Sequence, residues 1–220
     1  MLKFFRKRKL LELNIKLPLN EKRKRAKILV IDDEETFPVE LLTNEGYNIR
    51  HWKKIESLRS LEDGEFDIIF LDIFDVAKDI SNDDGLGILE HLKKYNPSQI
   101  IIAYSGRSFD LSKTKFWKLA DDTLAKPSDL VTCKEVIDKM LEDRFNLQYY
   151  WNNLTFVLKE NSVDGKTISK IEDSLVKVLS KGEKISIHEI LPVALRTTEL
   201  IAKIAPLANT IIKLASGNSL

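Results

Sequence analysis

The 220-residue sequence predicts an α/β fold: a doubly wound, five-stranded parallel sheet with a C-terminal α-helical region and a basic N-terminal arm. Short apolar segments alternate with amphipathic ones in the middle of the chain, which is typical of a parallel sheet covered by helices on both faces. Charge is segregated too, because residues 1–27 carry a net charge of +9, residues 28–143 carry −11 and residues 144–220 carry +3. We therefore expect an arm over 1–26, a sheet domain over 27–144 and a helical region over 145–220.

The overall composition excludes several classes of protein. Hydrophobic residues make up 43% and charged residues 31%, as in ordinary globular proteins. A single cysteine, Cys133, excludes an intrachain disulfide framework and a cysteine-based zinc cluster. No segment has the 18 or so apolar residues of a membrane span, and the charged start lacks the apolar core of a secretory signal. We expect a cytoplasmic protein.

The arm combines alternating apolar residues with clusters of basic ones. Leucine or isoleucine at every second position over 11–19 predicts a strand, and Pro18 would confine it to a sheet edge because proline cannot donate to the ladder. The basic clusters at 6–9 and 22–25 leave two interpretations open. The arm either docks on its own chain or binds a polyanion, which would be nucleic acid or an anionic membrane.

The middle of the chain supplies the elements of the sheet domain in alternation. Apolar runs predict strands at 27–31, 48–52, 67–72, 99–104 and 123–126. Amphipathic segments predict helices near 37–45, 54–62, 86–95, 111–119 and 132–145. Ligands of such sheets bind beyond the carboxyl ends of the strands, so a functional site is expected there.

Polar side chains stand where the predicted strands end. They are Asp32, Asp33, Asp72, Ser105 and Lys126. Carboxylates that converge on one edge repel one another, and a hard divalent cation such as Mg²⁺ relieves the repulsion. A hydroxyl and an ammonium beside such a cluster can bind a phosphoryl group. The pattern therefore predicts a site that places a phosphoryl group on a carboxylate.

These residues belong to a series of short motifs in chain order. The motifs are Ile31-Asp32-Asp33-Glu34, Leu71-Asp72, Asp84-Gly85-Leu86, Ser105-Gly106 and the segment ADDTLAKP at 120–127. Through them, residues 27–143, about half of the chain, resemble the receiver domain of bacterial two-component response regulators, which has a flavodoxin-like fold. The last 77 residues match no family that we recognise.

The resemblance implies a role for each site residue. Asp72 would accept a phosphoryl group from a histidine kinase or a histidine phosphotransfer protein. Asp32, Asp33, Asp72 and the backbone carbonyl of Phe74 would hold Mg²⁺. Ser105 and Lys126 would bind the phosphoryl oxygens, and the peptide bond before Pro127 would be cis. The function expected is phosphorylation-switched signalling without enzymatic activity on other substrates, and the alternative is a phosphorylation-independent scaffold that binds a partner or a membrane.

The sequence departs from the receiver pattern at three places. The loop between Asp72 and Asp84 is longer and more acidic than usual, and the first helix of the domain is short. Thr123 stands where receivers usually carry a tyrosine or phenylalanine that reports phosphorylation. We expect that any such report passes through Tyr104 or through residues 105–120, which include Trp117.

The C-terminal region is expected to be helical. Residues 145–160 predict a helix that continues the last helix of the sheet domain, 161–166 a turn and 167–180 an amphipathic helix. A final helix from about 190, kinked at Pro206, carries a stripe that includes Leu200, Ile204, Leu207 and Ile211. The stripe fits three arrangements: an intrachain bundle, a homodimer or a membrane-surface helix. We expect a non-catalytic output, because no basic recognition helix is evident.

Overall fold

The computed structural model describes residues 9–13, 15–96, 98–106, 114–181, 190–192, 195 and 197–215. These residues form two compact units. The first unit contains residues 18–145, and the second contains the described residues of 1–17 and 146–220.

The first unit is built on a parallel sheet of five strands. The strands are β1 (Lys27–Ile31), β2 (Asn48–Trp52), β3 (Ile68–Leu71), β4 (Ile100–Ser105) and β5 (Asp122–Ala125). Their order in the sheet is β2-β1-β3-β4-β5, and every neighbouring pair is parallel. This is the flavodoxin-like order, so the predicted fold class is confirmed. The order reverses between β1 and β3, which is where a doubly wound sheet opens its binding crevice.

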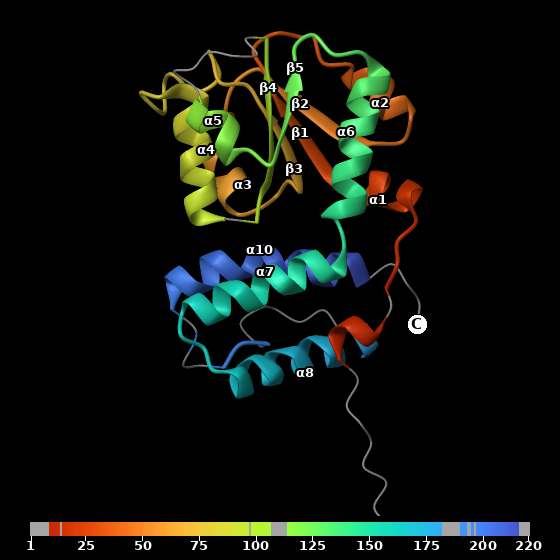
Figure 1. Cartoon of the computed structure of the whole chain (residues 1–220), viewed down its shortest axis with the longest axis vertical. Helices are drawn as coiled ribbons and strands as arrows, with labels where there is room; N and C mark the ends of the chain where they lie inside the picture. The colour runs from red at the N-terminus through yellow and green to blue at the C-terminus, as the bar shows by residue number, and fades with distance from the viewer. Residues whose placement is uncertain are drawn as a thin grey trace, which may run out of the picture. The chain divides into compact units, whose positions relative to one another are not determined.

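Helices cover both faces of this sheet. They are α2 (Val39–Asn44), α3 (Leu58–Glu62), α4 (Asp84–Tyr95), α5 (Thr114–Leu119) and α6 (Leu130–Asp143). Figure 1 shows α3, α4 and α5 on one side of the sheet, and α2 and α6 on the other. All five lie within or near the segments that the sequence predicts, and each connection between strands carries one helix.

The core explains why the strands are nearly continuous apolar runs. All residues of β3 and β4 are buried, because each strand has a helical layer on either side. Ile69 and Leu71 point into the cluster that α3, α4 and α5 cover. Phe70 points the other way and packs against Phe37, with ring centroids 4.9 Å apart, and Phe37 in turn meets Tyr104 at 5.1 Å.

The arm does not form the predicted edge strand in its described residues, so that prediction is wrong. Residues Leu10–Leu13 form a 3₁₀ turn, η1, and residues Leu19–Arg25 form helix α1. In η1 the Glu12 amide donates to the Lys9 carbonyl and the Glu12 carboxylate accepts from the Lys9 amide, both at 3.0 Å. Pro18 is the N-cap of α1, where its carbonyl accepts from the Lys22 amide at 3.0 Å, instead of lying in an edge strand. Local hydrogen bonds therefore override the period-two pattern.

Helix α1 belongs to the first unit and is fastened to α6. The Arg23 guanidinium pairs with the Asp138 carboxylate, which also accepts a hydrogen bond of 2.7 Å from the Tyr47 hydroxyl. The same guanidinium lies 4.9 Å from the centroid of the Tyr47 ring. Lys22 donates a 2.7 Å hydrogen bond to the Leu141 carbonyl in the last turn of α6. Part of the basic arm is thus a structural element of the sheet unit.

The second unit is helical. Its helices are α7 (Leu147–Glu160), α8 (Gly165–Lys181) and α10 (Thr198–Ala215). Figure 1 shows α7 and α10 side by side, and their residues are in contact. The stripe of α10 that the sequence identifies, Leu200, Ile204, Leu207 and Ile211, is buried. None of the helices in the described part of the chain combines the length and apolar content that a membrane crossing requires.

Two boundaries in this unit differ from the prediction. Helix α7 does not continue α6, because Asn146 interrupts the chain in an extended conformation and its side chain accepts from the Tyr149 amide at 2.9 Å. This N-cap begins a new helix. Helix α10 starts at Thr198 instead of near 190, so Pro192 lies outside it, and the Thr197 hydroxyl accepts from the Leu200 amide at 3.3 Å. The turn predicted at 161–166 is present between α7 and α8 but covers only 161–164, because α8 begins at Gly165.

Candidate functional site

Asp72 directly follows the buried strand β3 and is itself only 4% exposed. Its Oδ1 accepts a hydrogen bond of 2.6 Å from the Ile73 amide. Its Oδ2 accepts from the Lys126 ammonium, with 2.5 Å between the two atoms. Burial raises the pKa of Asp72, and the hydrogen bond and charge of Lys126 offset only part of this rise. The carboxylate is therefore held in one position by two donors and is poorly hydrated.

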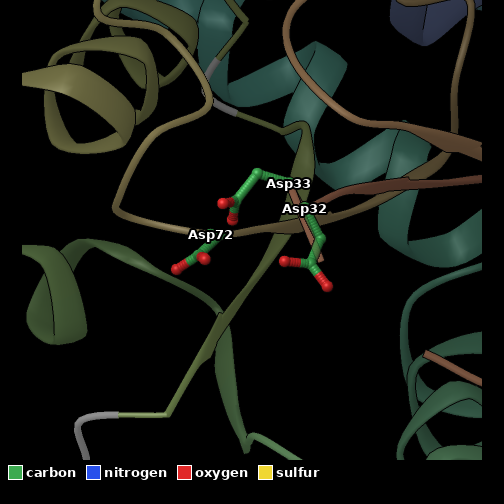
Figure 2. A group of neighbouring side chains, drawn as sticks. All are labelled: Asp32, Asp33 and Asp72. Atoms are coloured by element: carbon green, nitrogen blue, oxygen red, sulfur yellow. The ribbon is translucent and has the colours of Figure 1, made fainter. Parts of the chain in front are cut away.

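Two further carboxylates come from the turn after β1. Asp32 is fully buried, and its Oδ1 accepts from the Glu34 amide at 3.2 Å, whereas Asp33 is exposed. Because β1 and β3 are neighbours, their ends meet, and carboxylate oxygens of all three aspartates lie within 4.8 Å of one another. Figure 2 shows this group at the ends of the strands. The structure thus brings together the three side chains that the sequence predicts as metal ligands.

Lys126, one residue beyond β5, joins two of these carboxylates. Its ammonium contacts Oδ1 of Asp32 as well as Oδ2 of Asp72, and its side chain is 7% exposed. Burial lowers the pKa of this ammonium, but the hydrogen bonds to the two carboxylates outweigh the burial and raise the pKa overall. The cation therefore stays charged and balances one of two buried negative charges.

A pocket of about 390 Å³ opens above these residues. Its walls include Asp72, Phe74, Ser105, Gly106, Lys126 and Pro127. Ser105 ends strand β4 and is buried, and its carbonyl accepts from the Lys126 amide at 3.2 Å. The Lys126–Pro127 peptide bond is cis. The predicted phosphoacceptor, the predicted phosphoryl-binding pair and Phe74 therefore line the same pocket.

The donor set of this site fits Mg²⁺. Three carboxylates contribute hard oxygen ligands, and one of them, Asp72, lines the pocket. Mg²⁺ binds one or a few carboxylates and retains waters or phosphate oxygens at its other positions. The exposed Asp33 and the open space of the pocket provide room for such ligands.

The structure adds site residues that the sequence reasoning missed. The Thr36 hydroxyl lies 3.5 Å from Oδ2 of Asp32 and 3.2 Å from the hydroxyl of the buried Tyr104. His51, on β2, places its Nε2 2.8 Å from the Asp32 carbonyl. The spacing of four residues between Asp32 and Thr36 is too common a pattern to have indicated this contact. The sequence predicts Tyr104 only as a reporter, whereas in the structure its ring also lies 5.1 Å from the Lys126 ammonium.

The prediction of how phosphorylation is reported concerns Thr123 and the segment after Ser105. Thr123 is exposed on β5 and is paired with Ala103 of β4. Phe116 is fully buried, and Trp117 packs partly buried against it, with ring centroids 5.6 Å apart. Residues 107–113, which join Ser105 to this helix, lie outside the described residues.

Among proteins of known structure, this chain is similar to receiver domains. A CheY-like receiver domain from Methanospirillum hungatei is 25% identical over 54% of this chain and 94% of its own, with a TM-score of 0.45. The receiver domain of NtrX from Brucella abortus is 27% identical over 53% and 99%, with a TM-score of 0.44.

A third similar structure is the response regulator TrrA from Thermotoga maritima, solved in complex with Mg²⁺ and BeF. It is 29% identical over 53% of this chain and 99% of its own, with a TM-score of 0.43. No protein-family model and no curated protein sequence matches the chain.

Proposed function

We propose that this protein is a phosphorylation-switched signalling protein, similar to a response regulator, in which Asp72 accepts a phosphoryl group. The observation that carries the proposal is that Asp72, Ser105 and Lys126 line one pocket. Asp72 is held there by Lys126, and the buried Ser105 lines the same pocket. A carboxylate nucleophile, an ammonium and a hydroxyl are the groups that a transferred phosphoryl group requires.

The proposed donor is the phosphohistidine of a histidine kinase or of a histidine phosphotransfer protein. An oxygen of Asp72 attacks phosphorus in line, the P–N bond breaks, and its electron pair returns to the imidazole nitrogen. Lys126 then pairs with an oxygen of the transferred group, and Ser105 donates a hydrogen bond to another. The hydrogen bond from the Ile73 amide holds Oδ1 of Asp72, so that the same carboxylate is oriented before the attack.

Asp32, Asp33, Asp72 and the carbonyl of Phe74 are the residues that would hold Mg²⁺. When bound, Mg²⁺ supplies positive charge that reduces the repulsion between the carboxylates and the phosphoryl oxygens. The chain's own contribution is to bring the ligands together, since the parallel pairing of β1 with β3 places Asp32 and Asp72 at adjacent strand ends.

The output is proposed to be helical and non-catalytic, and the protein is proposed to be cytoplasmic. The buried stripe of α10 supports helix packing within the chain, because α10 contacts both α7 and α8. Dimerisation through these helices stays a prediction. Binding of nucleic acid or an anionic membrane by the basic arm also stays a prediction. The fastening of Lys22 and Arg23 to α6 supports docking of that part of the arm on its own chain.

Mass spectrometry of the intact protein tests the proposal. Incubation with Mg²⁺ and a small acyl phosphate should add one acid-labile phosphoryl group to the wild type and none to Asp72→Asn. The matched control is Asp75→Asn, since Asp75 is an acid of the same pocket, and it should be labelled like the wild type. Labelling of Asp72→Asn would refute the assignment. A wild type that is never labelled would favour the phosphorylation-independent scaffold, which the exposed Thr123 in place of an aromatic residue also favours.

A further inference from the structure

The Asp84 carboxylate binds three consecutive backbone amides of the long loop that follows Asp72. Its Oδ2 accepts from the Asp75 amide at 2.5 Å, and its Oδ1 accepts from the Val76 amide at 3.1 Å and the Ala77 amide at 2.7 Å. Asp84 is the first residue of α4, so the rigid start of that helix carries the acceptor. The loop that the sequence marks as an unusual insertion is thus fixed in its first half.

Packing fixes the same loop from its other side. Ile73, Val76 and Ala77 are each at most 3% exposed and belong to the core cluster under α3 and α4. The Val76 carbonyl accepts from the Ile55 amide at 2.9 Å. The loop therefore has three of its apolar side chains in the core and three of its amides on Asp84, and these contacts together determine the path of the backbone beside Asp72.

Gly85 brings this arrangement close to the predicted phosphoacceptor. Its amide donates to the Ile73 carbonyl at 3.1 Å, and a Cβ at this position would lie 2.1 Å from the Asp72 carbonyl oxygen. No side chain can occupy that space. The start of α4 and the backbone of Asp72 are consequently in direct contact.

One of the three amides shares a peptide group with a predicted metal ligand. The Asp75 N–H and the Phe74 carbonyl belong to the same planar unit, in which a trans peptide directs the two groups oppositely. When Asp84 fixes the direction of this N–H, it also fixes the direction of the Phe74 carbonyl. Phe74 lines the pocket together with Asp72.

We infer that Asp84 is a positioning residue of the Mg²⁺ site, acting through the Asp75 amide on the Phe74 carbonyl. The inference rests on the proposed function, since it assumes that this carbonyl is a ligand. Residues that orient metal ligands typically change metal affinity 10- to 100-fold when they are altered. Asp84 would act in this way without contacting the metal itself.

Mg²⁺ affinity of the full chain, measured by titration calorimetry, tests the inference. Asp84→Asn removes one of the two acceptor oxygens and still tolerates the backbone φ of +50° at this position. We expect roughly 10- to 100-fold weaker Mg²⁺ binding. The matched control is Asp83→Asn, which removes the same charge at the neighbouring residue. The side chain of Asp83 is exposed, so this variant should bind Mg²⁺ like the wild type.

Asp84→Glu separates geometry from charge, because it keeps the carboxylate but displaces it from the three amides. It should also bind Mg²⁺ more weakly, and it carries the test if Asp84→Asn does not fold. Melting curves in EDTA should show that each variant used is folded before the titration.

Wild-type affinity in Asp84→Glu, or equal weakening in Asp84→Asn and Asp83→Asn, would overturn the inference. The proposed metal site would survive that result, provided that Asp33→Ala still abolishes binding. A wild type that binds no Mg²⁺ would overturn both.

Discussion

Removal of the Lys126 ammonium should destabilise the first unit strongly, because it leaves Asp32 and Asp72 buried without their shared cation. Unit charges within 4.8 Å of each other repel by about 3.5 kcal/mol or more at an effective dielectric constant of about 20. Loss of one partner from a buried ion pair typically costs about 3–5 kcal/mol. We therefore expect Lys126→Met to lower the free energy of unfolding by about 3–5 kcal/mol.

Urea unfolding of the full chain in EDTA, followed by circular dichroism, measures this loss. With a denaturant dependence of about 2 kcal/mol per molar urea, the midpoint should fall by about 2 M. Lys118→Met is the matched control, because Lys118 is an exposed lysine, and its midpoint should not change. Added Mg²⁺ should restore more stability to Lys126→Met than it adds to the wild type, since the cation replaces the lost charge.

The pH dependence of the stability of Lys126→Met tests the same prediction independently. Burial already raises the pKa of Asp72 above its unfolded value of 3.8, and removing Lys126 should raise it further. An acid whose pKa is higher in the folded state loses stabilisation as the pH rises through that interval. Lys126→Met should therefore regain stability as the pH falls from neutrality toward 3.8, and Asp72→Asn in the same background should restore stability at neutral pH. A midpoint equal to that of Lys118→Met would refute the reasoning.

Mg²⁺ should raise the melting temperature of the wild type but have little effect on Asp33→Ala, because that variant lacks one of the three clustered carboxylates; an equal shift in both would place the metal elsewhere. Leu207→Ala should cost about 2–5 kcal/mol by urea unfolding, since Leu207 is only 1% exposed in α10; an unchanged midpoint would contradict that burial. Burial raises the pKa of the Cys133 thiol to about 12, so iodoacetamide at pH 8 should modify it only after denaturation. Phosphorylation of Asp72 should change Trp117 fluorescence in Thr123→Ala as in the wild type; a response lost only in the variant would make the threonine hydroxyl the relay.

The sheet and the position of its acids could be predicted from sequence because two simple causes act together. Strands buried on both faces must be continuously apolar, as β3 and β4 are, and this pattern marks their ends within one or two residues. Parallel strands end at the same edge, so Asp32 and Asp72 had to meet once β1 and β3 were neighbours.

The structure of the arm, the break before α7 and the contacts of Asp84 could not be predicted, because they depend on local backbone conformation and long-range contacts. The alternating arm residues fit a strand, but the structure buries Leu10 and leaves Leu11 40% exposed in a turn of its own. The break before α7 comes from a single cap at Asn146, in a segment whose apolar density suggested a continuous helix. The contact of Asp84 with three amides occurs together with left-handed conformations at Asp75 and Asp84, which no composition rule indicates.

Helix α1 has a practical consequence for anyone preparing the sheet domain alone. A fragment trimmed to 27–144, as the sequence motifs suggest, would discard Leu19–Arg25 and with it both anchors on α6. Tyr47 and Asp138 would then face each other without Arg23, and the Leu141 carbonyl would lose the Lys22 donor. A fragment spanning 18–145 retains these contacts and is the better starting point for crystallisation or spectroscopy.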